Sequence, residues 1–111
     1  MATYTTKELK AVTQLTATAA TLYTAPASTT TTIKTIVISN VTASAATVTL
    51  YVVPSAGTAG ATNAIMLGVP IAANTITTID TAIVIPTGAF VSALASATGT
   101  INVHLSGIEI A

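Results

Sequence analysis

Apolar and polar residues alternate most clearly between residues 33 and 53. Over residues 47–52 each kind takes every second position: Val48, Leu50 and Val52 alternate with Thr47, Thr49 and Tyr51. A period of two places the two sets on opposite faces of a β-strand. Residues 36–38 are apolar without interruption, which is typical of a central strand covered on both faces. A small domain has little material to cover both faces, so we expect another subunit to supply part of the covering.

The rest of the chain predicts further short strands separated by turn residues. Strand-like runs lie at 12–15, 21–25, 64–67, 75–80, 82–85, 89–95 and 100–110. About eight strands, spaced by about 8–12 residues, are typical of an antiparallel sandwich or a small barrel. We expect an all-β protein with a single antiparallel β-sandwich, either jelly-roll or immunoglobulin-like. The expected division is an N-terminal arm or first short element over residues 1–14 and the sandwich domain over residues 15–111.

The last expected strand changes phase near its end. Its apolar positions share one face up to residue 105 and the opposite face beyond it: Ile101, Val103 and Leu105, then Ile108 and Ile110. One extra residue on a strand, a β-bulge, restores the phase of the side chains that follow it. The sequence therefore predicts a bulge at Gly107 that keeps both sets of side chains inward.

The composition differs from that of an ordinary soluble domain. Charged residues make up 5% of the 111 residues, hydrophobic residues make up 51%, and the formal net charge is zero. Little electrostatic repulsion keeps such molecules apart. We therefore expect an obligate oligomer, a dimer or a trimer, or a part of a larger particle. No run approaches the ~18 apolar residues of a membrane span, and the first ten residues lack the pattern of a secretory signal.

Few side chains are available for catalysis or for holding a metal ion. The chain has one histidine, one aspartate, two glutamates and no cysteine. No motif groups them, so we expect no catalytic site, no metal site and no cofactor. We interpret His104 as a half-exposed strand residue; a pair with Asp80 beside a serine, and a metal shared between copies on a symmetry axis, are the alternatives. Three lysines without arginine form no basic stripe for nucleic acid. Lys34 is expected at a strand edge, where its charge discourages stray pairing.

Two sets of residues are candidates for contacts with other molecules. An N-terminal arm would reach a neighbouring subunit through three side chains: Tyr4, Lys7 and Leu9. The polar face of residues 47–51 supplies the second set: Thr47, Thr49 and Tyr51. We interpret Tyr51 as an interface anchor or, alternatively, as a ring that stacks on a sugar. Phe90 is expected in the core.

The strand–turn–strand runs over residues 22–31, 33–40 and 46–54, followed by residues 71–75 and 103–110, carry a family resemblance. They resemble small β-sandwich virion proteins of tailed bacteriophages. The resemblance covers roughly residues 20–111 and carries over no site residues. It implies a virion protein assembled in the host cytoplasm, either a capsid decoration or cement protein or a tail or fibre component. Its implied partner is the major capsid or tail protein. The alternative function is a receptor- or carbohydrate-binding module on a fibre.

Overall fold

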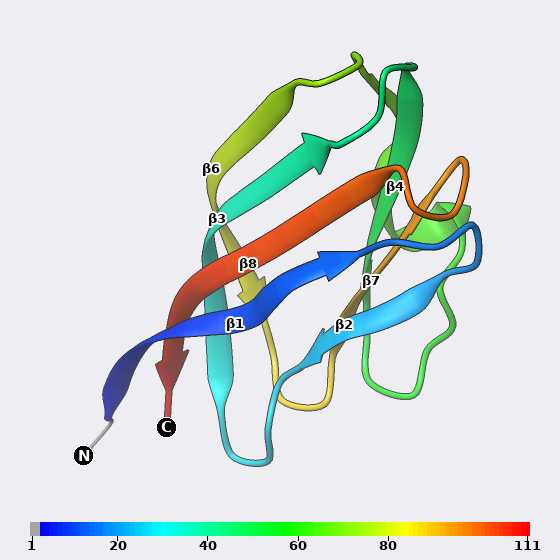
Figure 1. Ribbon diagram of the computed structural model, residues 1–111. Helices are drawn as coiled ribbons and strands as arrows, with labels where there is room; N and C mark the ends of the chain where they lie inside the picture. Colours follow the sequence, from blue (N-terminus) through cyan, green and yellow to red (C-terminus); the bar gives the residue numbers. More distant parts are fainter. Residues whose placement is uncertain (1–2) are drawn as a thin grey trace.

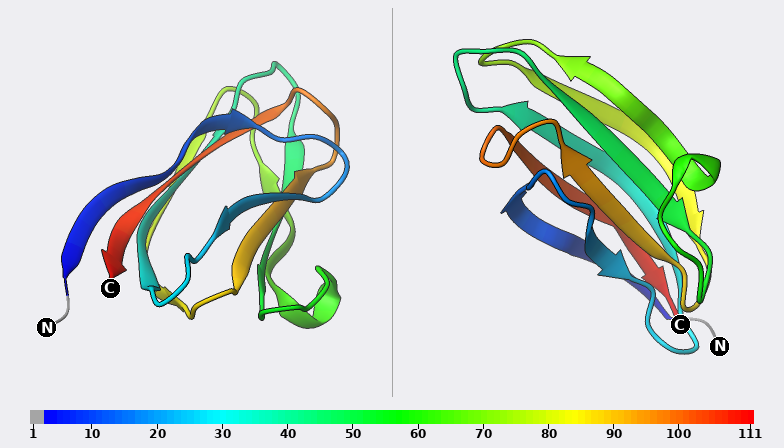
Figure 2. Two further views of the ribbon diagram at one scale, coloured as in Figure 1. Left: turned by 90° about the horizontal axis from the view of Figure 1, so that it is seen from below. Right: turned by 90° about the vertical axis from the view of Figure 1, so that its right-hand side faces the viewer.

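Residues 3–111 are described by the structure, a computed structural model, and they form two facing four-stranded sheets (Figures 1 and 2). Sheet A has the strand order β1 (Tyr4–Gln14), β8 (Ile101–Ile110), β3 (Thr30–Asn40) and β6 (Ile76–Ile85). Sheet B has the order β2 (Ala20–Thr24), β7 (Phe90–Ala95), β4 (Ala46–Val53) and β5 (Ala64–Ile71). One short 3-10 helix, η1 (Ala61–Asn63), lies in the loop between β4 and β5.

The strands pair as a folded ribbon. The first strand pairs with the last, β2 pairs with β7, β3 with β6, and β4 with β5, all antiparallel. This nested pairing, shared between two sheets, is the jelly-roll arrangement. The expected all-β sandwich is therefore confirmed, and the strand order decides for the jelly roll over the immunoglobulin-like alternative.

The core lies between the two sheets and takes alternate residues from the inner strands and from the edge strands β5 and β6. Its largest fully buried side chains come from both sheets: Ile33, Ile36, Ile38, Leu50, Ile71, Ile85, Ile101, Leu105, Val48, Val91 and Val103. Val53 is also fully buried, but it pairs with Phe90 on the outer face of sheet B and is not part of this cluster. Full burial of a Val, Leu or Ile side chain is worth about 1.5–3 kcal/mol. These residues therefore supply much of the free energy that holds a chain without disulfides together.

Strand β3 is central, as expected, but only one of its faces is closed. Ile36 and Ile38 are fully buried, whereas Val37 is half-buried on the outer face of sheet A. The same strand corrects the expectation for Lys34. Because β3 lies between β8 and β6, Lys34 stands in the interior of the sheet and not at a strand edge.

The irregularity expected in β8 lies near Gly107, as expected, but the extra residues are on the neighbouring strands β1 and β3. Gly107 pairs with Ile33 of β3 and with Lys7 of β1 in an unbroken β8, and the extra residues are Lys34 on β3 and Leu9 on β1. The expected bulge at Gly107 is therefore wrong, and Ile108 and Ile110 are half-buried rather than inward core residues. The position demands glycine for another reason. An added Cβ would lie 2.1 Å from the Thr32 carbonyl oxygen.

The first strand and the chain ends complete one edge of sheet A. The segment expected as an arm or first short element contains β1, which pairs along β8. Thr3 and Ala111 exchange backbone hydrogen bonds, so the first described residue and the last lie side by side at one end of the sandwich (Figure 2). One edge of sheet B is β5, which carries Pro70; proline is tolerated at an edge because it donates no ladder hydrogen bond.

Candidate functional site

The outer face of sheet A carries an open hollow over β1, β8 and β3. The hollow has a volume of about 530 Å³ and is lined by Thr6, Lys7, Glu8, Lys34, His104, Ser106, Gly107 and Ile108. Alternation along β8 and β1 turns His104 and Glu8 outward, and their Nε2 and Oε2 atoms lie 2.9 Å apart. Both side chains are open to water, at 27% and 58% exposure, so this contact is worth at most about 1 kcal/mol.

The hollow does not assemble a catalytic constellation. His104 contacts Glu8 and not Asp80, which lies on β6, two strands away from β8. Within residues 3–111, no hydrogen bond joins the His104 ring to a serine hydroxyl. Over the same residues, no three side chains of His, Asp or Glu approach closely enough to hold a metal ion. The helical part of the described chain contains no segment long and apolar enough to cross a membrane.

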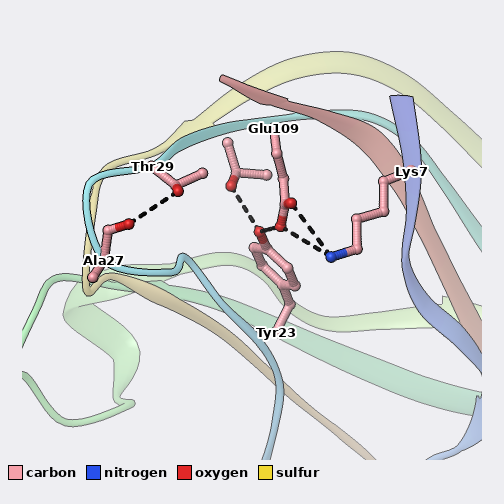
Figure 3. A network of polar contacts seen from close by, with 6 residues as sticks. Lys7, Tyr23, Ala27, Thr29 and Glu109 are labelled. Atoms are coloured by element: carbon pink, nitrogen blue, oxygen red, sulfur yellow. Dashed lines mark hydrogen bonds and ion pairs between the residues drawn. The ribbon is translucent and has the colours of Figure 1, made fainter. Parts of the chain in front are cut away.

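A polar network closes one end of the sandwich between the sheets (Figure 3). Tyr23 of β2 donates its hydroxyl proton to Glu109 of β8, and Thr31 of β3 donates to the Tyr23 oxygen at 2.8 Å. Lys7 of β1 lies 3.3 Å from the Glu109 carboxylate. Four strands from both sheets are thereby tied together at the end that also holds Thr3 and Ala111.

The network shifts the pKa values of its two central members. Burial, followed by the hydrogen bond to Glu109, raises the pKa of Tyr23 to about 12. The hydrogen bond from Tyr23, helped by the Lys7 ammonium, lowers the pKa of Glu109 below its ordinary value. Both shifts favour the neutral phenol and the charged carboxylate, which is the pairing that holds the network together.

Of the N-terminal candidates, only one has an unengaged side chain. Tyr4 is 70% exposed at the open end of β1, whereas Leu9 is buried in the core and Lys7 is paired with Glu109. Contact of this segment with a neighbouring subunit stays a prediction, and Tyr4 is its most accessible residue. Sequence spacing gave no sign of the Tyr23–Glu109 pair, because 86 residues separate its members and only the strand order joins them.

The second set of candidates lies on the outer face of sheet B, which we call the neutral face. Its outward residues come from β4, β5 and β7: Thr47, Thr49, Tyr51, Ile65, Leu67, Phe90, Ser92 and Leu94. Tyr51 and Thr49 are largely buried within this surface, and Thr49 Oγ1 accepts a hydrogen bond from the Gly68 amide at 3.0 Å. Phe90 is half-buried on this face and pairs with Val53, so its expected place in the core is wrong; the next residue, Val91, enters the core instead.

The Tyr51 side chain is largely buried within the neutral face. The residue is 9% exposed, and its hydroxyl makes no hydrogen bond to the described part of the chain. Within residues 3–111, the one fully buried polar side-chain atom without a hydrogen-bond partner is Asn102 Oδ1, so the unpaired Tyr51 hydroxyl is not fully buried. The phenol oxygen is therefore not completely covered, and at 9% exposure of the whole residue little of the ring is open for a sugar to stack on.

Comparison with known proteins shows likeness in fold rather than in sequence. No family model matches the sequence, and no curated protein sequence matches it. A chain in the structure of infectious bursal disease virus, Gx strain, is similar with a TM-score of 0.51 and 19% identity, over 99% of this chain and 32% of that chain. The present chain thus spans about a third of that virus chain.

Two further solved structures are similar with lower scores. A chain of the infectious bursal disease virus VP2 subviral particle has a TM-score of 0.48 and 17% identity, over 99% of this chain and 32% of that chain. The tobacco streak virus coat protein has a TM-score of 0.46 and 11% identity, over 99% of this chain and 85% of that chain. The fold likeness of the first virus chain agrees with the jelly-roll strand order that the present structure displays.

Proposed function

We propose that this chain is a non-enzymatic structural protein of a virion and that it acts as a capsid decoration or cement protein, of the kind found in tailed bacteriophages. One observation carries the proposal: the chain is a single jelly roll whose fold is similar, over 99% of its length, to part of an infectious bursal disease virus chain. A composition with 5% charged residues supports a protein that works by covering surface.

The proposed mechanism is association followed by docking. Copies associate as dimers or trimers, and the end of the sandwich that carries Tyr4 contacts the major capsid protein and bridges its subunits. Each contact is modest, but a shell holds many copies, so the contacts resist expansion of the shell together. A tail or fibre position with the tail protein as partner is the second location that the proposal covers.

The alternative of a receptor- or carbohydrate-binding module is less well supported. Sugar stacking needs an exposed aromatic ring. The Tyr51 ring is buried, which leaves Tyr4 as the strongly exposed aromatic side chain of residues 3–111. A glycan array with the Tyr4→Ala variant as control tests this alternative directly: specific glycan binding that the variant loses would favour it.

The proposal is tested by fractionating particles from a lysate of the infected host on a density gradient. We expect the chain to migrate with intact particles at a fixed copy number. Particles assembled without it should release their contents at a lower temperature than complete particles. Recovery of the chain only from the particle-free fractions would overturn the proposal. Labelling of the chain in electron micrographs then shows whether the chain is located on the shell or on the tail.

A further inference from the structure

The charges of this protein are confined to one of its two sheets. All six charged side chains and the single histidine lie on strands of sheet A: Lys7, Glu8, Lys10, Lys34, Asp80, His104 and Glu109. Sheet B and every loop of the chain carry none. The sandwich therefore has one charged side and one uncharged side, as an amphipathic helix has, although its net charge is zero.

The uncharged side is also supplied with apolar anchors. On the neutral face Leu67 is 64% exposed and Ile65 is 48% exposed, and the half-buried Leu94 lies on the central strand β7 beside Thr49. The largely buried Tyr51 lies on the same face. Buried cores of protein interfaces are depleted in charge and enriched in aromatic residues, which is the composition of this surface.

We propose that the neutral faces of two copies pack against each other about a two-fold axis and form a dimer. A charge buried against an uncharged surface loses its hydration without gaining a partner, which costs several kcal/mol per ion. The neutral face is therefore matched by a surface that is itself uncharged. A second copy supplies such a surface by symmetry, because in a two-fold dimer the same patch meets itself.

The outer face of sheet A is a poorer candidate for the same contact. It also exposes apolar side chains, among them Val12, Ile76 and Val84. These lie among Glu8, Asp80 and Lys34, so packing two such faces together would desolvate at least three charges per copy. In the proposed dimer the charged sheets face water on both sides and keep the dimer soluble.

The size of the neutral face sets the strength of the contact. The four strands of sheet B have 5, 6, 8 and 8 residues. At about 4.8 Å between strands and about 3.3 Å per residue, they give a face of roughly 19 by 22 Å, or about 430 Å². Two such faces bury about 860 Å² in total, which is below the size of stable specific interfaces and in the range of weak, transient contacts. The dimer should therefore be dependent on concentration rather than permanent.

This inference rests on the association of copies in the proposed function and names the surface that carries it. Its test is sedimentation velocity of the purified chain between about 1 µM and about 1 mM, the range of small interfaces. We expect a monomer–dimer equilibrium in the unmodified chain. Leu67→Lys and Thr47→Lys place a charge on the neutral face and should each weaken dimerisation at least tenfold.

The control variant is Val84→Lys on sheet A. Val84 is 58% exposed on an edge strand, so the substitution matches Leu67→Lys in chemistry and exposure. We expect its dissociation constant to stay within about threefold of that of the unmodified chain, because surface substitutions away from a contact usually change free energies only slightly. Circular dichroism and the urea midpoint check that each variant is folded. A monomer at every concentration, or dissociation by Val84→Lys equal to that by Leu67→Lys, would overturn the inference.

A distance measurement gives a second readout that does not depend on weakening the dimer. The chain has no cysteine, so single spin labels can be attached to Thr47→Cys on the neutral face or to Thr78→Cys on the outer face of sheet A. We expect the shorter label-to-label distance for Thr47→Cys, and the reverse order would refute the proposed face. A monomer that migrates with particles overturns this inference and the association step of the mechanism but leaves the virion role standing, whereas a dimer absent from particles overturns the virion role and leaves this inference standing.

Discussion

Replacing Gly107 by alanine should destabilise the protein far more than one methyl group suggests. The added Cβ would meet the Thr32 carbonyl oxygen at 2.1 Å, the Ile33 Cα at 3.0 Å and the Leu9 Cδ1 at 3.1 Å. Two of these atoms belong to the backbone of β3, which cannot rotate away as a side chain does. Strands β3 and β8 must therefore separate by roughly 1 Å at the centre of sheet A, beside the irregular level of the ladder.

The magnitude follows from two costs. Overpacking a well-filled interior costs about 1–3 kcal/mol. Weakening one ladder hydrogen bond at the Ile33–Gly107 pair adds about 1 kcal/mol. The free energy of unfolding should therefore fall by about 2–4 kcal/mol. For a chain of 111 residues, at about 4 °C per kcal/mol, Tm should fall by about 8–16 °C.

The assay is urea unfolding followed by circular dichroism at one fixed protein concentration, because association would shift the apparent stability. The matched control is Gly60→Ala. Gly60 has an extended backbone, and an added Cβ there meets no atom within 4 Å, so this variant should be as stable as the unmodified chain or more stable by up to about 1 kcal/mol. If Gly107→Ala unfolds within about 0.5 kcal/mol of the unmodified chain, the close approach of β3 to Gly107 is not what requires glycine there.

Three further predictions concern the polar contacts of sheet A. Tyr23→Phe removes the hydrogen bond to Glu109 and should lower the free energy of unfolding by about 1–3 kcal/mol in urea, whereas Tyr4→Phe on an exposed ring should not change it. The pKa of Glu109 is lower in the folded chain than its ordinary 4.5, so its stabilisation is present above about pH 4.5 and is lost as the pH falls through the folded pKa. Urea titrations at several pH values should show a weaker acid dependence in Glu109→Gln, and an equal dependence would contradict the assigned role. His104→Ala removes an exposed contact with Glu8 and should change the free energy of unfolding by less than about 1 kcal/mol; a larger loss would show a role beyond that contact.

The local pattern determined the strands because alternation is a property of neighbouring residues. Val48 and Leu50, placed on one face by a period of two, are both core residues. The apolar run at residues 36–38 likewise predicted the central place of β3 in its sheet. The phase change in β8 was real, but its physical cause was not local. The extra residues lie on β1 and β3, so only the ladder shows that Gly107 keeps its phase while its neighbours bulge.

Low charge and high apolar content were set by the sequence alone, and so was the expectation that copies associate. Which surface associates was not. The charges on β1, β3, β6 and β8 are far apart along the chain. They share a sheet because the nested pairing of the jelly roll places β1 beside β8, and β3 between β8 and β6. Tyr23 and Glu109 meet for the same reason. Periodicity acts between residues a few positions apart and fixes which way a side chain points; the strand order, which depends on the packing of the whole core, fixes what that side chain meets.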